Sequence, residues 1–397
     1  MRFAFTDEQR GFQKTLRDFL AKECPPSAVR AAWAGRAARS DAGRDAGGEH
    51  HSVDEAGRWS RLAALGVVGL LVPEELGGLA LDEIDLVLLL EECGRAALPD
   101  PVLETSAVAV PLLREAGGDL AASWLPSVAD GTATIAVGLE SSPFVTDAAR
   151  ARLILLERGG AWYALDREQA QLQPERSVDG ARRLFRVGLP PGATRPFLDG
   201  AEARHAADRA LDRGALGAAA ELIGLSQRMI DLTVEYVKVR EQFGRPIGSF
   251  QAVKHHLADA TLKLEFARPV VYRAAHSVAR DVPARALHVS MAKACASDAA
   301  TLIAKKALQC HGAIGYSFEH DLHLFMKRAW ALAASWGDAA FHRARVASLV
   351  LDRAGHPQAH PNREAPPDSD GNAALHKEHF ATQHPITALQ QPPQGDL

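Results

Sequence analysis

Hydrophobic residues recur at helical spacing along the first third of the chain. Phe12, Leu16 and Leu20 form the first such stripe, and Thr6 with Gln9 three residues later has the spacing of a capping box. The helical pattern resumes near residue 59 and again near residue 82, after two stretches without periodicity. We therefore predict an N-terminal helical domain over residues 1–129, with further helices near residues 59–65, 82–92 and 101–126.

The pattern changes near residue 130, where apolar residues come in short runs. Strands are predicted at residues 134–139, 151–157, 161–165 and near 183–187. Gly159 and Gly160 separate the second run from the third and favour a hairpin turn. These features indicate a small middle β domain, residues 130–205.

Helical spacing resumes at residue 206 and continues to about residue 354. Leu216, Ala220, Ile223 and Ile230 step by threes and fours, which is typical of a long bundle helix. Three more helices are predicted, at about residues 250–279, 282–311 and 321–353. The chain is thus predicted to be mainly α with a small β domain, and residues 206–354 to form a four-helix bundle.

Two segments lack this periodicity. Residues 30–54 are rich in Ala, Arg, Gly and Asp, and we interpret them as a mobile connection. Residues 355–397 carry seven prolines and five histidines, so a disordered tail is expected there.

Charge and cysteine usage exclude several classes of protein. The chain has 45 basic and 49 acidic residues, a net charge of −4, and no clustered positive charge that a nucleic acid would need. The four cysteines form no C-x-x-C pair, which argues against a zinc site and suits a reducing cytoplasm. No third ligand accompanies the His255-His256 or His320 and His323 pairs, so no metal is expected. The longest apolar stretch, residues 65–72, is too short to cross a membrane.

Three segments resemble the acyl-CoA dehydrogenase family. They read VPEELGG at residues 72–78, REQFGRPIGSFQ at residues 240–251 and QCHGAIGY at residues 309–316. The resemblance covers about residues 3–350 and implies a helical domain, a β domain and a helical bundle. It also implies FAD as cofactor and an acyl-CoA as substrate.

In the family, the second and third segments contact the FAD of a neighbouring subunit. Carried over by position, the implied cofactor contacts are Arg240, Gln242, Phe243, Gln309 and Gly312. An arginine offers a fixed fork of donors that matches a pyrophosphate, and glycine permits close approach of backbone to phosphate. The alternative is a surface ion pair for Arg240, a core position for Phe243 and a helix cap for Gly312.

The family chemistry needs a carboxylate base, and members place a Glu at one of two positions. Here those positions hold Trp336 and Gly214, neither of which can accept a proton. Glu221 stands seven residues beyond the second position, roughly 10 Å along the same helix. Asp338 follows the first position by two residues. Both are weak candidates. A buried Glu such as Glu221 is more often paired within a bundle, and a two-residue shift on a helix turns Asp338 toward a different direction.

The β domain also departs from the family. Most members carry a Thr-Glu-Pro-x-x-Gly-Ser-Asp string that holds the flavin ring, whereas residues 138–147 here read GLESSPFVTD. Trp162 on the hairpin could stack on a ring, but cross-strand packing is the more common role. An intact flavin-ring pocket within this chain is therefore doubtful.

Three hypotheses follow. The chain resembles the incomplete subunit of bacterial dehydrogenases built from two unlike chains, which implies a heterotetramer with a second acyl-CoA dehydrogenase-like chain. Such chains often act on acyl-CoAs with steroid side chains or other bulky groups. The alternatives are an autonomous FAD enzyme with a relocated base, and a non-catalytic scaffold or regulator.

Overall fold

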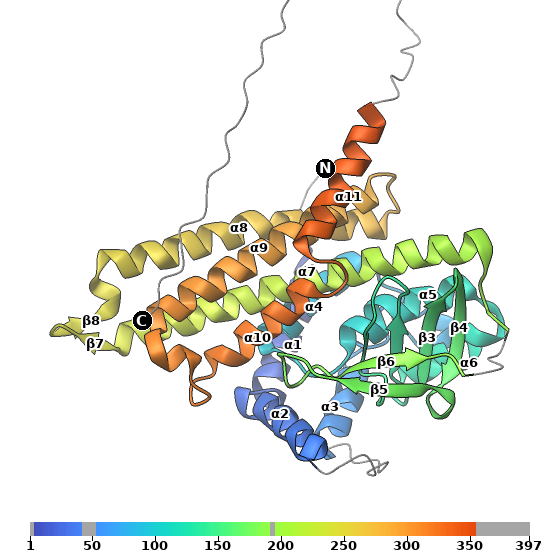
Figure 1. Ribbon diagram of the computed structural model, residues 1–397, viewed down its shortest axis with the longest axis horizontal. Helices are drawn as coiled ribbons and strands as arrows, with labels where there is room; N and C mark the ends of the chain where they lie inside the picture. Colours follow the sequence, from blue (N-terminus) through green and yellow to red (C-terminus); the bar gives the residue numbers. More distant parts are fainter. Residues whose placement is uncertain (1–3, 42–52, 191–194, 355–397) are drawn as a thin grey trace, which may run out of the picture. The chain divides into compact units, whose positions relative to one another are not determined.

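The N-terminal part of the chain is helical, as predicted. The computed structural model describes residues 4–41, 53–190 and 195–354 (Figure 1). The Thr6 hydroxyl accepts from the Gln9 N–H and the Gln9 side chain accepts from the Thr6 N–H, which confirms the capping box. The helices in this part are α1 (Asp7–Glu23), α2 (Pro26–Asp41), α3 (Val53–Ala64), α4 (Glu83–Ala96), the π-helical η2 (Leu103–Ala109), α5 (Val110–Ala116) and α6 (Gly118–Ala129), with a short 3-10 turn η1 (Glu74–Leu76).

The predicted connection over residues 30–54 was wrong in its described part. Helix α2 continues to Asp41, and α3 already begins at Val53. Alanine and arginine are strong helix formers without any apolar stripe, and Pro26 suits a first helical position. Val29 and Ala32 are buried, so tertiary packing holds this helix. The remainder of the predicted connection, residues 42–52, lies outside the described residues.

Two three-stranded sheets form the middle of the chain. Their strand orders are β1-β3-β4 and β2-β6-β5, with β1 parallel to β3 and the other pairs antiparallel. The four predicted strands are confirmed; β2 and β5 were missed because one has two residues and the other is mostly polar. The strands are β1 (Ile135–Gly138), β2 (Val145–Thr146), β3 (Leu153–Arg158), β4 (Ala161–Asp166), β5 (Gln171–Glu175) and β6 (Leu184–Gly188).

Four long helices follow and pack together, with α7 against α8, α9 and α10 (Figure 1). A hairpin of β7 (Glu241–Gln242) and β8 (Arg245–Pro246) extends from the end of α7. The helices are α7 (Gly200–Val239), α8 (Gln251–Ala279), α9 (Arg285–His311), α10 (Leu322–Ala334) and α11 (Ala339–Ala354). The predicted bundle of four helices is thus present, followed by α11.

The single helix predicted over residues 321–353 was wrong. The chain leaves helical geometry between α10 and α11, where Trp336 has φ of 55° and Gly337 has φ of 85°. Left-handed backbone at a bulky residue costs free energy and persists only where surrounding contacts hold it. This break places Trp336 at the candidate site described below.

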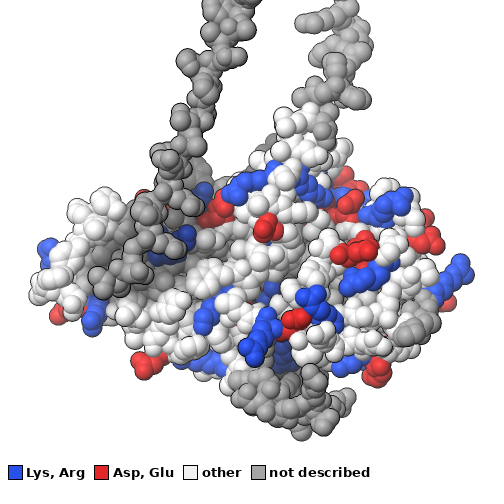
Figure 2. All heavy atoms as spheres, viewed as in Figure 1, with Lys and Arg blue, Asp and Glu red and all other residues white. Residues whose placement is uncertain are grey.

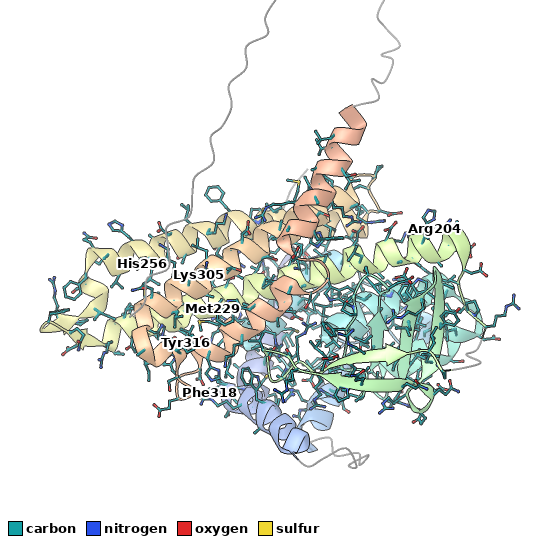
Figure 3. All side chains as sticks on the ribbon, in the orientation of Figure 1. Arg204, Met229, His256, Lys305, Tyr316 and Phe318 are labelled. Atoms are coloured by element: carbon teal, nitrogen blue, oxygen red, sulfur yellow. The ribbon has the colours of Figure 1, made fainter. Side chains whose placement is uncertain are left out.

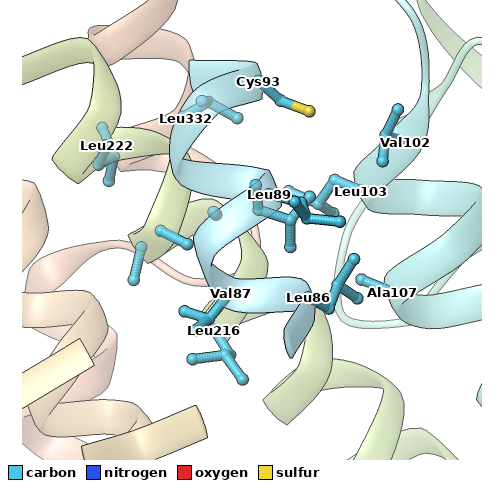
Figure 4. Packing of buried hydrophobic residues seen from close by; sticks show 14 of the residues in the cluster. Leu86, Val87, Leu89, Cys93, Val102, Leu103, Ala107, Leu216, Leu222 and Leu332 are labelled. Atoms are coloured by element: carbon cyan, nitrogen blue, oxygen red, sulfur yellow. The ribbon is translucent and has the colours of Figure 1, made fainter. Parts of the chain in front are cut away.

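Helix α4 is the centre of the hydrophobic core. Leu86 and Leu89 on α4 pack among Leu103 and Ala107 of η2 and Leu216 of α7 (Figure 4). Among the described residues, no helix combines the length and apolarity needed to span a membrane. Basic and acidic side chains are interspersed over the face shown in Figure 2.

Candidate functional site

Trp336 and Gly214, the two positions at which the sequence resemblance implies a base, lie in contact. A Cβ atom added to Gly214 would fall 2.2 Å from Cδ2 and Cε3 of the Trp336 indole. The ring therefore packs against α7 at Gly214, and only glycine leaves room for it. Two segments far apart in the chain converge on one point, where this protein has an indole instead of a carboxylate.

Glu221 is buried on α7 and faces a small polar cavity. Its side chain is 9% exposed, and burial raises its pKa to about 8, although the nearby Arg328 opposes the shift. The cavity measures about 20 Å³, which suffices for about one water molecule. Its walls also include Glu104, Asp147 and Arg182. Glu221 is thus protonated near neutral pH and sits in a space too small for an acyl chain.

Asp338 has a local structural role. Its carboxylate oxygen Oδ1 accepts from the Phe341 backbone N–H at 2.8 Å, so the side chain caps the start of α11. The residue is exposed. Of the two candidate bases, Glu221 is buried and Asp338 is exposed.

Arg182 fills the junction between the second sheet and the bundle. Its guanidinium donates to the Thr146 hydroxyl at 2.9 Å, to the Ser335 hydroxyl at 2.5 Å, and lies 3.4 Å from the Glu104 carboxylate. Thr146 belongs to the segment that matches the flavin-ring string. Its hydroxyl is already engaged with a buried arginine, so the residues of this junction do not fit a flavin ring held by this chain.

Trp162 packs rather than offering a stacking face. The side chain is fully buried, and its indole N–H donates to the Ala203 carbonyl at 3.1 Å. The hairpin tryptophan therefore fastens β4 to the first turn of α7.

The implied cofactor-contact residues form an exposed arm at the far end of the bundle. Phe243 is 92% exposed at the tip of the β7–β8 hairpin, with φ of 54°. It is therefore not a core residue. Arg240 and Gln242 are exposed as well, and within the described chain Arg240 makes no ion pair. An arginine and an aromatic ring held open in this way fit the pyrophosphate and flat parts of a cofactor bound by another chain.

The second arm segment lies at the same end of the bundle. The Tyr236 ring, four residues before Arg240, stacks on His311 with 4.4 Å between ring centroids. Gln309 and Gly312 flank this histidine and are exposed. Gly312 has φ of 64° and ends α9, so it is a helix cap, and a Cβ there would meet no atom within 4 Å. The stack thus joins the ends of α7 and α9, which carry the two segments.

Two residues of this site were missed by sequence reasoning. Arg182 lies directly before a predicted strand and has no spacing signal. Lys293 stands alone among small residues on the buried face of α9, which is an unusual position for a lysine and a signal that could have been used.

Two known protein-family models match this chain. The family described as "Acyl-CoA dehydrogenase, N-terminal domain" matches residues 6–132, and the family described as "Acyl-CoA dehydrogenase, C-terminal domain" matches residues 204–351. The matched ranges include Gly214, Arg240, Gln309 and Trp336.

Individual relatives agree with the family match. Acyl-CoA dehydrogenase IpdE2 from Mycobacterium tuberculosis is 36% identical over 325 residues, covering 81% of this chain and 91% of the relative. The fold is similar to the ChsE4-ChsE5 complex from Mycobacterium tuberculosis, with a TM-score of 0.73 at 22% identity over 90% of this chain and 100% of that one. A Tcur3481-Tcur3483 steroid ACAD variant gives a TM-score of 0.75 at 22% identity, covering 88% of this chain and 99% of that one.

Proposed function

Because this chain belongs to the acyl-CoA dehydrogenase family, we propose that it serves α,β-dehydrogenation of an acyl-CoA as the arm-bearing subunit of a mixed oligomer. A second, unlike chain of the family supplies the base and the flavin-ring pocket. This chain supplies the cofactor-contact arm, Arg240, Gln242, Phe243, Gln309 and Gly312, from across the interface.

The contact between Trp336 and Gly214 carries the proposal. The reaction removes a proton from the carbon beside the thioester, which requires a carboxylate within reach. Both positions for that carboxylate meet in this chain, and an indole occupies the meeting point. The buried Arg182 blocks the matching flavin-ring junction in the same way.

The arm retains what the neighbouring site requires. FAD, the cofactor of the family, would supply the hydride acceptor when bound in the partner's site. Arg240 would bind the pyrophosphate with its fork of donors, and the exposed Phe243 would cover a flat part of the cofactor. The Gln309 amide would donate and accept at the cofactor edge, and Gly312 would admit close approach of the backbone. None of these residues needs to move a proton.

The structural neighbours support a partner and a class of substrate. One is a complex of two named chains, ChsE4 and ChsE5, and another is described as a steroid ACAD. Both likenesses carry over the fold alone, so a heterotetramer and an acyl-CoA with a bulky, steroid-like group are part of the proposal.

The test is purification of this chain alone and together with a candidate partner of the same family from the same genome. We expect visible flavin absorbance only in the mixed oligomer, whose mass is measured in solution. Arg240→Ala should release flavin from that oligomer. Arg204→Ala is the matched control, because Arg204 is an exposed arginine near the opposite end of α7 (Figure 3).

Two other outcomes would favour the alternatives. Stoichiometric flavin on the lone chain that bleaches with an acyl-CoA would indicate an autonomous enzyme and make Glu221 the residue to replace. If Arg240→Ala leaves the flavin content of the mixed oligomer unchanged, this chain would be a non-catalytic scaffold.

A further inference from the structure

A buried lysine lies behind the Trp336 loop. The Lys293 side chain is fully buried on α9. Its amine nitrogen lies 3.0 Å from the Ala333 carbonyl, 2.9 Å from the Gly337 carbonyl and 3.3 Å from the Ser297 hydroxyl. All its hydrogen-bonding capacity is therefore used within the fold, and none is left for a ligand.

The two carbonyls stand on either side of Trp336. Ala333 is in the last turn of α10, and Gly337 follows the tryptophan directly. The Lys293 amine thus bridges the two ends of the loop by hydrogen bonds to both carbonyls. Such carbonyls at a helix end need donors when they are buried.

Two further contacts hold the same loop. The His342 Nε2 atom donates to the Trp336 carbonyl at 2.9 Å, and Arg182 donates to the Ser335 hydroxyl. Each residue of the segment 335–337 is therefore held from a different element: the β domain, α11 or α9. Constraints of this kind maintain the left-handed backbone at Trp336.

We infer that Lys293 is a positioning residue that holds the Trp336 indole against Gly214 and thereby closes the acyl slot of this chain. The identity of that slot rests on the proposed function. One turn beyond Gly214, α4, η2 and α7 leave a cavity of only about 10 Å³, with Leu86, Leu90, Ala107 and Gly217 in its walls. This volume is at the lower limit for one water molecule. The walls also include Glu83 and Arg213, and Arg213 directly precedes Gly214, which the indole covers.

The closure does not depend on the charge of the lysine. Burial lowers the pKa of Lys293 to about 7, with Asp338 opposing the shift and Arg182 adding to it. A neutral amine still has two N–H donors for the two carbonyls and can accept from the Ser297 hydroxyl. The loop is therefore expected to stay closed on both sides of neutral pH, and His342 faces it as a neutral donor.

Lys293→Met tests the positioning role, because methionine is similar in length but has no donor. Acrylamide quenching of tryptophan fluorescence is measured with and without Trp336→Phe, so that the difference reports Trp336 alone. We expect quenching of Trp336 to rise about twofold in Lys293→Met, since two buried carbonyls lose their donor. Lys306→Met on the same helix, ~20 Å away, should leave it unchanged. Equal quenching in wild type and a folded Lys293→Met would overturn the inference.

A second measurement does not depend on Lys293→Met folding. Calorimetric titration of the chain with octanoyl-CoA should give no saturable heat for wild type or for Trp336→Phe, which keeps a ring in place. Trp336→Ala should instead give a saturable binding isotherm, because the slot opens beside Gly214. A folded Trp336→Ala that binds no better than wild type would refute closure by the indole. Neither result depends on flavin in a mixed oligomer, so the proposed function stands or falls separately.

Discussion

The Arg182 guanidinium donates a 2.5 Å hydrogen bond to the Ser335 hydroxyl, across 153 residues of sequence. This bond ties the β domain to the loop that places Trp336. The same arginine lies beside the Glu104 carboxylate of η2, so one side chain joins all three parts of the fold. Arg182 is 8% exposed, and Glu104 is 6% exposed.

Replacing Arg182 with methionine should destabilise the chain strongly. The change leaves the buried Glu104 carboxylate without its partner, which typically costs about 3–5 kcal/mol. Urea denaturation measures the effect. Arg186→Met is the matched control, because the Arg186–Glu175 pair is partly exposed and its loss should cost about 1 kcal/mol or less. Equal costs for the two variants would contradict a central role for Arg182.

Glu221→Gln should stabilise the chain more as pH rises. The folded-state pKa, raised to about 8 by burial, lies above the ordinary 4.5, so the folded state holds a proton that the unfolded state releases between those values. The contribution of Glu221 to the free energy of unfolding is greatest below pH 4.5. It is lost as pH rises toward 8, by at most about 1.4 kcal/mol per pH unit. Glutamine is neutral throughout. Thermal melts at pH 4.5, 6 and 8 should show a growing gap between wild type and variant, and none for the exposed Glu75→Gln.

Gly214→Ala should destabilise the chain even though alanine favours helices. The added methyl group would meet the Trp336 ring at 2.2 Å, and such overpacking costs about 1–3 kcal/mol. In Trp336→Ala the same Gly214→Ala change should instead be stabilising, by up to ~1 kcal/mol of helix propensity. A double-mutant cycle by urea denaturation gives the coupling. Gly11→Ala on α1, where a Cβ meets no atom within 4 Å, should stabilise in both backgrounds.

His311→Phe should protect the chain against acid. Burial lowers the pKa of His311 to about 4, and its Nδ1 atom donates to the Ala307 carbonyl while Nε2 has no partner among the described residues. Because the folded-state pKa is depressed, the contribution of His311 to the free energy of unfolding is greatest above about pH 6.5. It is lost as pH falls toward 4. Phenylalanine keeps the stack on Tyr236 without this titration. Urea denaturation at pH 5 and pH 7 should show that His311→Phe loses less stability at pH 5 than wild type or the exposed His205→Gln. An identical loss in all three would contradict the prediction.

Phe243→Ala should leave the stability of the lone chain within ~0.5 kcal/mol, because the ring is 92% exposed. In the mixed oligomer it should lower the flavin content, which absorbance measures after gel filtration. Phe266→Ala, at an exposed phenylalanine on α8, is the control for loss of an apolar surface ring. Flavin loss in Phe266→Ala alone would place the cofactor contact elsewhere.

The α–β–α order and most element positions could be predicted from the chain because they depend on local periodicity. The capping box at Thr6 and the stripe from Leu216 to Ile230 are such local signals. The alanine-rich α2 was missed because it has no apolar stripe, although its composition favours a helix. The arm residues remain predictions about a cofactor, now with the finding that they are exposed at one end of the bundle.

The amino-acid sequence by itself determined the family and most of its elements, and counting along its motifs predicts that Gly214 and Trp336 stand where the family has its base. Only the tertiary structure decided that the two residues touch, that Arg182 reaches Ser335, and that Lys293 holds the ends of the Trp336 loop. The physical reason is that periodicity reports hydrogen bonds and burial within one element. The neighbours of a side chain depend on how distant elements pack, and here that packing places the Trp336 ring against Gly214.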